Sequence, residues 1–326
     1  MPKKQKMFAD DGWAIWVDGD DTSTVYINDW LNPKGKSYVD LAVRVRGIKS
    51  SKSLHVYVPF AVSTDEIEDV SLLFNDTKIL QATFSAACIV DYKKNEHTSE
   101  IAYNGKTVDI VHISTLEYET TSMSDGTLIN ISFEKIQQFI DNDEAYFIWR
   151  MPHKTLDAIF KPRVDVGNAM DRLRDLITTP VVSEKYGYSI RINESRLLPE
   201  RITRIGMFHR QKLKKAVVTL SIDENYELND AGCYRIRRLE ENLYEGYLPN
   251  KYNCEDVITY QWQQNREDNL NGHFNFYYNV FKNSVSKNSM FLYMVLLLAI
   301  GIVGDLLSEI VKTLISNNIL TFVFIR

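Results

Sequence analysis

The feature that most constrains this chain is an uncharged apolar run near its end, MFLYMVLLLAIGIVG at residues 290–304. Fifteen such residues fall just short of the roughly 20 that a helix needs to cross a bilayer. After Asp305 the chain continues as LLSEIVKTLIS, which is still mostly apolar. A helix over residues 289–315 is therefore long enough for a tilted span. We predict one C-terminal transmembrane helix.

The polar side chains of this segment fall on one face of the predicted helix, because they recur at helical spacing between residues 305 and 316. Ionisable groups inside a span are costly and normally face other helices or water. Since the chain supplies one good span, those neighbours are expected to be further copies of the chain. This predicts a homo-oligomer whose C-terminal helices surround a polar lumen. The predicted pore-lining residues are Leu298, Ile302, Asp305, Glu309 and Lys312.

Two other interpretations of the apolar run remain open. In the first, a simple anchor ends at Gly304, and an amphipathic helix then lies among the lipid headgroups with its charges in water. In the second, the segment forms a buried hairpin in a soluble protein. The three interpretations differ in whether the helix continues through Ile315 and in what covers it.

The start of the chain, MPKKQKMFADDGW, has basic residues but no apolar core, so it does not resemble a secretory signal. Without such a signal, the 289 residues before the span are expected to stay in the cytoplasm. Lys282 and Lys287 on that side agree with this orientation. We predict a tail-anchored protein of the cell inner membrane. The cysteines show neither metal nor disulfide spacing, which is typical of a reducing compartment: Cys88, Cys233 and Cys254.

The first half of the chain reads as successive short strands. In YVDLAVRVRG, at residues 38–47, apolar side chains alternate with Arg44 and Arg46. The segments LHVYVPF, ILQATFSAACIVDY, TVDIVHIS and LINISF follow at the spacing of an all-β sandwich or barrel. FEKIQQFI at 133–140 is expected to be a short helix. The predicted fold is a β-rich α+β cytosolic domain with sandwich-like strands and a few helices, followed by the transmembrane helix.

The second half mixes helical and strand patterns. Residues 166–177 have helical spacing, and Pro199 is expected to open a helix that runs through RITRIGMFHRQKLKK. YSIRI, KAVVTLSID, GCYRIRR and VITYQWQQ read as strands. The aromatic segment from Asn269 is expected to lead helically into the span. We predict three parts: a β-rich domain at 1–152, a mixed α/β segment packed on it at 153–268, and a juxtamembrane and transmembrane helical region at 269–326.

No motif of a known enzyme class is present. The chain has no GxSxG, no P-loop, no GxGxxG and no HExxH. Its six histidines never approach metal-ligand spacing. The acidic run from Asp18 to Thr22 has ligands for a hard cation but lacks the remaining EF-hand positions, which favours a solvated turn. We predict no catalytic residue, no metal and no cofactor. A membrane-anchored hydrolase with a site assembled from distant residues is the enzymatic alternative.

The middle of the chain is basic although the whole is acidic. Residues 151–220 hold 14 basic and 7 acidic residues, whereas residues 1–150 hold 15 and 23. Arginines interleaved with aromatic residues suit a nucleotide or a short single strand, through phosphate contacts and stacking. If 200–213 is helical, its basic residues lie near one face. The alternatives are a solvated face, contact with anionic lipid, or pairing with the acidic first half. The predicted phosphate-binding residues are Arg201, Arg204, Arg210, Lys212, Arg235 and Arg237.

This layout, a β-rich body with a basic aromatic patch and one polar-faced C-terminal span, resembles the membrane effectors of bacterial antiviral defence. Effectors of CBASS systems are similar, and those of Hailong systems more so. The Hailong resemblance implies a nucleotidyltransferase partner that makes a short oligonucleotide, which a channel-like membrane protein senses. We therefore expect an oligomeric, ligand-gated membrane effector. Its partners would be itself, the lipid bilayer, a nucleotide or short oligonucleotide, and a ligand-producing enzyme. The alternative function is a non-channel adaptor that tethers a β-domain and binds a protein.

Overall fold

The structure is a computed structural model. It describes residues 9–19, 22–32, 35–84, 88–91, 95–103, 105–153, 182–205, 212–228, 232–244, 246–249, 256–266, 273–284 and 287–316. The chain divides into two compact units. The first comprises residues 1–162 and 186–280, and the second comprises residues 163–185 and 281–326.

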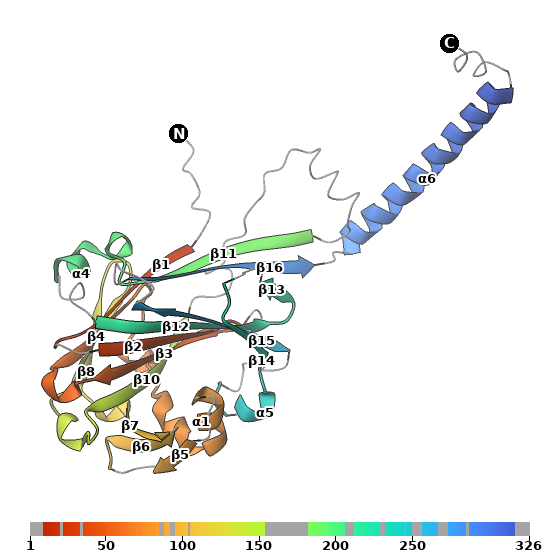
Figure 1. Ribbon diagram of the computed structural model, residues 1–326. Helices are drawn as coiled ribbons and strands as arrows, with labels where there is room; N and C mark the ends of the chain where they lie inside the picture. The colour runs from red at the N-terminus through yellow and green to blue at the C-terminus, as the bar shows by residue number, and fades with distance from the viewer. Residues whose placement is uncertain are drawn as a thin grey trace. The chain divides into compact units, whose positions relative to one another are not determined.

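Two mixed β-sheets make up the body (Figure 1). In the order in which its strands pair, the seven-stranded sheet contains β13 (Tyr226–Leu228), β16 (Phe274–Ser284), β11 (Val182–Ile192), β1 (Ala9–Val17), β4 (Ser53–Val58), β9 (Thr127–Ser132) and β8 (Tyr118–Ser122). The nine-stranded sheet contains β14 (Arg235–Arg238), β15 (Val257–Asn265), β12 (Lys212–Asp223), β2 (Thr22–Trp30), β3 (Ser37–Arg46), β10 (Glu144–His153), β7 (Lys106–Val111), β6 (Thr98–Tyr103) and β5 (Cys88–Asp91).

Short helices connect these strands. Within the described part of the body, the α-helices are α1 (Thr77–Phe84), α4 (Glu200–Ile205) and α5 (Glu241–Tyr244). Short 3₁₀-helices are η1 (Ile48–Ser50), η2 (Thr64–Glu66), η3 (Val70–Asn75), η4 (Ile113–Thr115), η5 (Gln137–Phe139) and η6 (Ser195–Leu197). The acidic segment around residues 63–74 contains two of these, η2 and η3.

The main core joins the inner faces of the two sheets. On β1, Trp13 and Ile15 point into this core, while Ala14 and Trp16 lie on the opposite face of the strand and pack against Ile202 of α4. This alternation follows from the two-residue period of a strand. The sheets therefore form a sandwich, and the expected β-rich fold is confirmed.

The outer face of the nine-stranded sheet is also apolar over part of its area. Trp30, Ala42 and Tyr146 pack there against buried residues of α1 and against the segment around α5, which contributes Tyr244 and Tyr247. Figure 1 shows α1 and α5 beside β14, β10 and β7. A strand with both faces covered has a nearly continuous apolar sequence. The runs IWVD, at the end of β1, and YFIWRM, in β10, are examples.

Parallel pairing joins the first two strands that the structure describes to two strands from the second half of the chain. β1 pairs with β11, and β2 pairs with β12, both in parallel. Asn193 follows β11 with a positive φ of 59°, a conformation that asparagine tolerates well. Its side-chain amide accepts a hydrogen bond from the Ile15 N–H (2.8 Å) and donates one to the Ile15 carbonyl (3.1 Å). This pair of bonds ties the end of β11 to the middle of β1.

The second unit contains α6 (Lys287–Ser316), drawn in blue in Figure 1. Among the described residues it is the one helix that is long and apolar enough to cross a membrane, with a mean hydropathy of 2.2 in an 18-residue window within Tyr293–Ser316. It does not end at Gly304. Leu298 and Ile302 are 66% and 62% exposed. A long helix that is apolar over most of its surface is typical of a membrane span or of a buried core, and this one is not buried.

Three expected elements differ from the structure in type or length, and a fourth, at residues 133–140, is shorter than expected. The predicted strand over ILQATFSAACIVDY is instead α1 followed by the short β5. The predicted helix after Asn269 is instead β16, in which alternate residues from Phe274 to Val280 are buried. The predicted helix from Pro199 ends at Ile205, and β12 begins at Lys212.

The reasons for these differences are local and physical. In α1 the buried positions Ile79, Leu80 and Ala82 have helical rather than alternating spacing. In β12 the β-branched and apolar run after Lys215 pairs with β2 and β15 on either side, which extends the strand back to Lys212. At residues 133–140 only the single turn η5 forms. The helical pattern at 166–177 lies outside the described residues.

Candidate ligand-binding site

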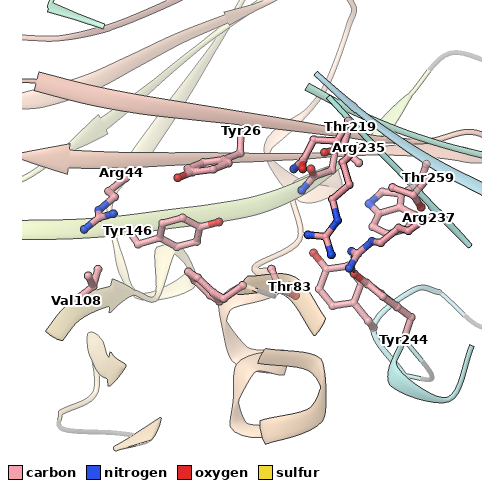
Figure 2. A pocket seen from close by; sticks show the side chains of 15 residues that line it. Tyr26, Arg44, Thr83, Val108, Tyr146, Thr219, Arg235, Arg237, Tyr244 and Thr259 are labelled. Carbon is pink, nitrogen blue, oxygen red and sulfur yellow. Dashed lines mark hydrogen bonds between the residues drawn. The ribbon is translucent and has the colours of Figure 1, made fainter. Parts of the chain in front are cut away.

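A cavity of about 320 Å³ lies on the outer face of the nine-stranded sheet (Figure 2). Its wall combines guanidinium groups, aromatic rings and small polar side chains. The lining residues are Tyr26, Asn28, Trp30, Arg44, Thr83, Phe84, Val108, Tyr146, Thr219, Arg235, Arg237, Tyr244, Tyr247, Thr259 and Gln261.

Strand alternation places these residues together. Side chains two apart on a strand share a face, so Tyr26, Asn28 and Trp30 of β2 all face the cavity. The same holds for Arg235 and Arg237 of β14. Pairing in register then brings the same face of β3, β12, β15 and β10 alongside. Helix α1 supplies Thr83 and Phe84, and the segment around α5 supplies the remaining wall.

Three arginines line the cavity, one from β3 and two from the edge strand β14. Arg44 on β3 forms an ion pair with Glu144. Arg237 on the edge strand β14 donates a hydrogen bond to the Tyr244 hydroxyl (2.7 Å). Arg235 is exposed and forms no ion pair with any residue that the structure describes. Burial raises the pKa of Tyr244, and the nearby Arg237 opposes part of that rise. The tyrosine hydroxyl therefore stays protonated at neutral pH.

The aromatic rings form two groups. Tyr146 lies beside Arg44 and contacts Tyr26 and Phe84, with ring centroids 6.1 and 5.3 Å apart. Trp30 contacts Tyr244 and Tyr247 at 5.7 and 5.9 Å. Figure 2 shows Arg44 near Tyr146 on one side, and Arg235 and Arg237 near Tyr244 on the other. Each group of rings thus lies next to cationic side chains.

A buried polar network holds the second group in place. Arg150 binds Asp40 through two hydrogen bonds (Nε to Oδ1, 2.7 Å; Nη2 to Oδ2, 3.0 Å) and the Tyr247 carbonyl through a third (2.7 Å). Asp40 also accepts from the Tyr247 hydroxyl (2.8 Å) and the Trp30 indole (2.7 Å). Burial alone would lower the pKa of Arg150, but the carboxylate of Asp40 raises it above its ordinary value. Arg150 therefore supports the wall and does not face a ligand.

A second, smaller basic cavity shares Arg44 with the first. It has a volume of about 80 Å³ and is lined by Ser23, Thr24, Arg44, Arg46 and Lys214. The register between β12 and β2 shifts by one residue at Lys214. Such a bulge redirects one side chain and locally disrupts the ladder. Positive charge therefore continues from the end of the main cavity that carries Arg44.

The structure separates the six predicted phosphate-binding residues. Arg235 and Arg237 line the cavity. Arg201 and Arg204 lie on α4, which packs on the outer face of the other sheet, and both are exposed. Arg204 forms an ion pair with Glu200 on the same helix (2.5 Å). Arg210 and the side chain of Lys212 lie outside the described residues. A single helical face over 200–213 is therefore wrong.

The predicted pore-lining residues all lie on α6. Leu298, Ile302 and Asp305 fall in the uninterrupted helix together with Glu309 and Lys312. Their side chains are exposed within the described structure.

The sequence interpretation missed the aromatic wall. Tyr26, Tyr146 and Tyr244 come from positions more than 90 residues apart, on β2, β10 and α5. The alternation of Tyr26, Asn28 and Trp30 was a usable signal for one face of one strand. Which strands lie beside β2, and which helix covers that face, is decided by the sheet order.

One buried arrangement has the composition of a hydrolase site. His112 contacts the Ser71 hydroxyl through Nδ1 and the Ser99 hydroxyl through Nε2, both at 2.9 Å. All three residues are at most 2% exposed, so a substrate cannot reach either serine. No group of three potential metal ligands occurs among the residues that the structure describes.

No protein-family model and no curated protein matches this sequence. The site therefore rests on its own geometry and chemistry.

Proposed function

We propose that this protein is a tail-anchored membrane effector whose β-rich body binds an anionic nucleotide or short oligonucleotide. The observation that carries the proposal is the grouping of Arg44, Arg235 and Arg237 with six aromatic rings around one cavity. Arginine binds phosphate through a planar fork of donors. Aromatic rings stack on bases of any sequence. A cavity that offers both is suited to a ligand that has both groups.

The spacing of the arginines favours more than one phosphate. Arg44 and Arg235 lie on β3 and β14, which are four strand steps apart in the sheet order. Neighbouring strands are about 4.8 Å apart, so the two backbone positions are separated by on the order of 19 Å. Both side chains project from the sheet face into the cavity rather than toward each other, so phosphates at two positions match them better than a single phosphate does. Arg46 and Lys214 continue the positive charge beyond Arg44. A short oligonucleotide matches this arrangement better than a mononucleotide.

In this proposal, copies of helix α6 form the pore that ligand binding controls. Copies anchored by the same helix enter the membrane in the same orientation, so their polar faces can surround a common axis. Asp305, Glu309 and Lys312 would line that axis, because ionisable groups avoid lipid. Ligand binding would shift the helices between closed and conducting states to the extent that the two states differ in ligand affinity. A role in antiviral defence, with a ligand-producing enzyme as partner, follows from the resemblance in layout.

The binding step is tested by calorimetry on the full-length protein in mild detergent. The probes are ATP and tetranucleotides of each base. We expect the tetranucleotides to bind more tightly than ATP. Because each charge-assisted contact contributes about 1.5–3 kcal/mol, Arg235→Ala should weaken binding roughly tenfold or more.

The matched control is Arg201→Ala on α4, which is exposed and outside the cavity. It should leave the affinity unchanged. If no probe binds the wild-type protein, or if the α4 variant loses as much affinity as Arg235→Ala, the cavity is not the binding site.

A second function has one observation in its favour. Tyr234 and Ile236, at the edge strand β14, are 69% and 62% exposed. An exposed edge strand with apolar side chains is able to pair with a strand of another protein. This would suit a membrane-tethered adaptor. Ile236→Glu should then abolish capture of the protein partner while nucleotide affinity stays the same, and the adaptor would be monomeric in detergent.

A further inference from the structure

Three polar side chains form a row across the floor of the cavity. Asn28 of β2 pairs in register with Thr219 of β12, and Thr219 pairs with Gln261 of β15. Arg235 of β14 lies opposite Gln261 and ends the row. All four side chains line the cavity. Adjacent strands in register place these groups about 5 Å apart.

The side chains of the three uncharged members of the row have no hydrogen-bond partner among the described residues. Thr219 is only 9% exposed, and Asn28 and Gln261 are half-buried. Their neighbour Thr259 differs, because its hydroxyl is paired with that of Ser221 (3.0 Å). None of the side-chain polar atoms of the row is sealed from solvent, so they are open to a ligand in the cavity. Here the donors and acceptors point at the same cavity from three strands.

We propose that the row Asn28–Thr219–Gln261 reads the hydrogen-bonding edge of one base of the ligand, and so makes the cavity selective for base identity. This inference rests on the proposed function. The two amides each offer a donor pair and an acceptor, and the hydroxyl offers either. Side-chain amides match an edge that carries an acceptor beside a donor, as adenine does. Tyr26 and Trp30 flank Asn28 on the same strand and supply ring surface beside the base.

Selectivity is expected from the cost of leaving these groups unpaired. A site built to hydrogen-bond its ligand rejects one that lacks the matching groups, because buried polar atoms then lose their partners. Arg235, at the end of the row, binds a phosphate next to the base that the row reads. The row therefore determines which base is accepted, and the arginines bind every sequence alike.

The experiment compares tetranucleotides of A, G, C and U by calorimetry with the full-length protein in mild detergent. The wild-type protein is expected to prefer one base by about tenfold or more, with A as the expected choice. Asn28→Leu and Gln261→Met keep the side-chain volume but remove the hydrogen-bonding groups. In both variants the affinities for the four tetranucleotides should differ by no more than about threefold, while the affinity for the least favoured base changes little.

The matched control is Gln138→Met, which makes the same chemical change at an exposed position outside the cavity. It should keep the full preference. Near-ultraviolet circular dichroism and the thermal midpoint check that each variant is folded; if either pocket variant is not, Thr219→Val takes its place.

The possible outcomes separate this inference from the proposed function. Loss of preference in the row variants alone supports the row. Equal binding of all four tetranucleotides by the wild type, or a preference that the variants keep, overturns the row and leaves the proposed function standing. Absence of binding by any tetranucleotide to the wild type overturns both.

Discussion

At the scale of single residues, a fully buried ion pair shapes the cavity wall. Asp40 and Arg150 are 0% and 1% exposed, and their pairing positions Trp30 and Tyr247 through hydrogen bonds to the same carboxylate. A buried ion pair gains little over an apolar replacement, but removing one partner leaves an uncompensated charge. The pair therefore matters more for geometry than for net stability.

We predict that Asp40→Asn destabilises the body by about 3–5 kcal/mol, because the Arg150 guanidinium stays buried without a counter-charge. Thermal and urea unfolding of the protein in mild detergent, followed by circular dichroism, measure this change. Arg196→Ala is the control: Arg196 pairs with Glu194 but is 79% exposed, so its loss should cost at most about 1 kcal/mol. Similar losses of unfolding free energy in the two variants would show that burial of the ion pair does not determine the size of the loss.

His55 gives a pH dependence. Its ring stacks on Trp16, with centroids 4.8 Å apart, and contacts the Ser53 hydroxyl (2.9 Å). Burial lowers the pKa of His55 below 6.5, and the charge of Asp18 opposes part of this shift. Between the lowered folded pKa and the unfolded value near 6.5, the unfolded chain binds more protons. Stability is thus present in full above pH 6.5 and is lost as the pH falls through the folded pKa.

We predict that the thermal midpoint of the wild type falls between pH 7 and pH 5, and that His55→Gln reduces this fall. Thermal unfolding at several pH values checks it, with the difference between variant and wild type as the readout. If the thermal midpoint of the variant falls with pH as steeply as that of the wild type, groups other than His55 cause the pH dependence.

At the scale of elements, the aromatic segment before α6 forms the strand β16 (Phe274–Ser284) instead of the expected helix. Phe274, Phe276 and Tyr278 are buried at alternate positions, as in a strand. Tyr277, between Phe276 and Tyr278, is 45% exposed. Because aromatic residues stand at both buried and exposed positions, the sequence does not show the alternation of apolar and polar side chains that is typical of a strand. The strand β16 is stabilised by its neighbours β11 and β13, which local sequence does not specify.

The prediction at this scale concerns the polar face of α6. Replacing Asp305 and Glu309 together with leucine should abolish leakage of dye from liposomes, because the lumen would lose its polar lining. Membrane association should persist, since the change makes the helix more apolar. Val303→Leu with Ile310→Leu, on the opposite face, is the matched control and should leave leakage intact. Unchanged leakage in the Asp305/Glu309 variant would contradict the pore assignment.

At the scale of the whole molecule, the proposal needs several copies of the chain around one axis. We predict that the full-length protein in mild detergent is a closed oligomer, whereas a truncated protein that ends at Lys287 forms an assembly with fewer subunits. The reason is that an isolated α6 would expose its ionisable groups to lipid. Light scattering coupled to size exclusion gives both masses. A full-length monomer would exclude the pore and favour the adaptor function.

The sequence by itself determined the β-rich body and the long apolar helix, because both are recorded in local periodicity: alternation in strands such as β3, and a continuous apolar run in α6. It also indicated the basic residues of β14, although not what faces them. Only the tertiary structure brought Arg44, Tyr146 and Tyr244 to one cavity and placed Arg201 and Arg204 elsewhere. The physical reason is that strand order and register are set by long-range pairing and burial, which no short stretch of this chain contains.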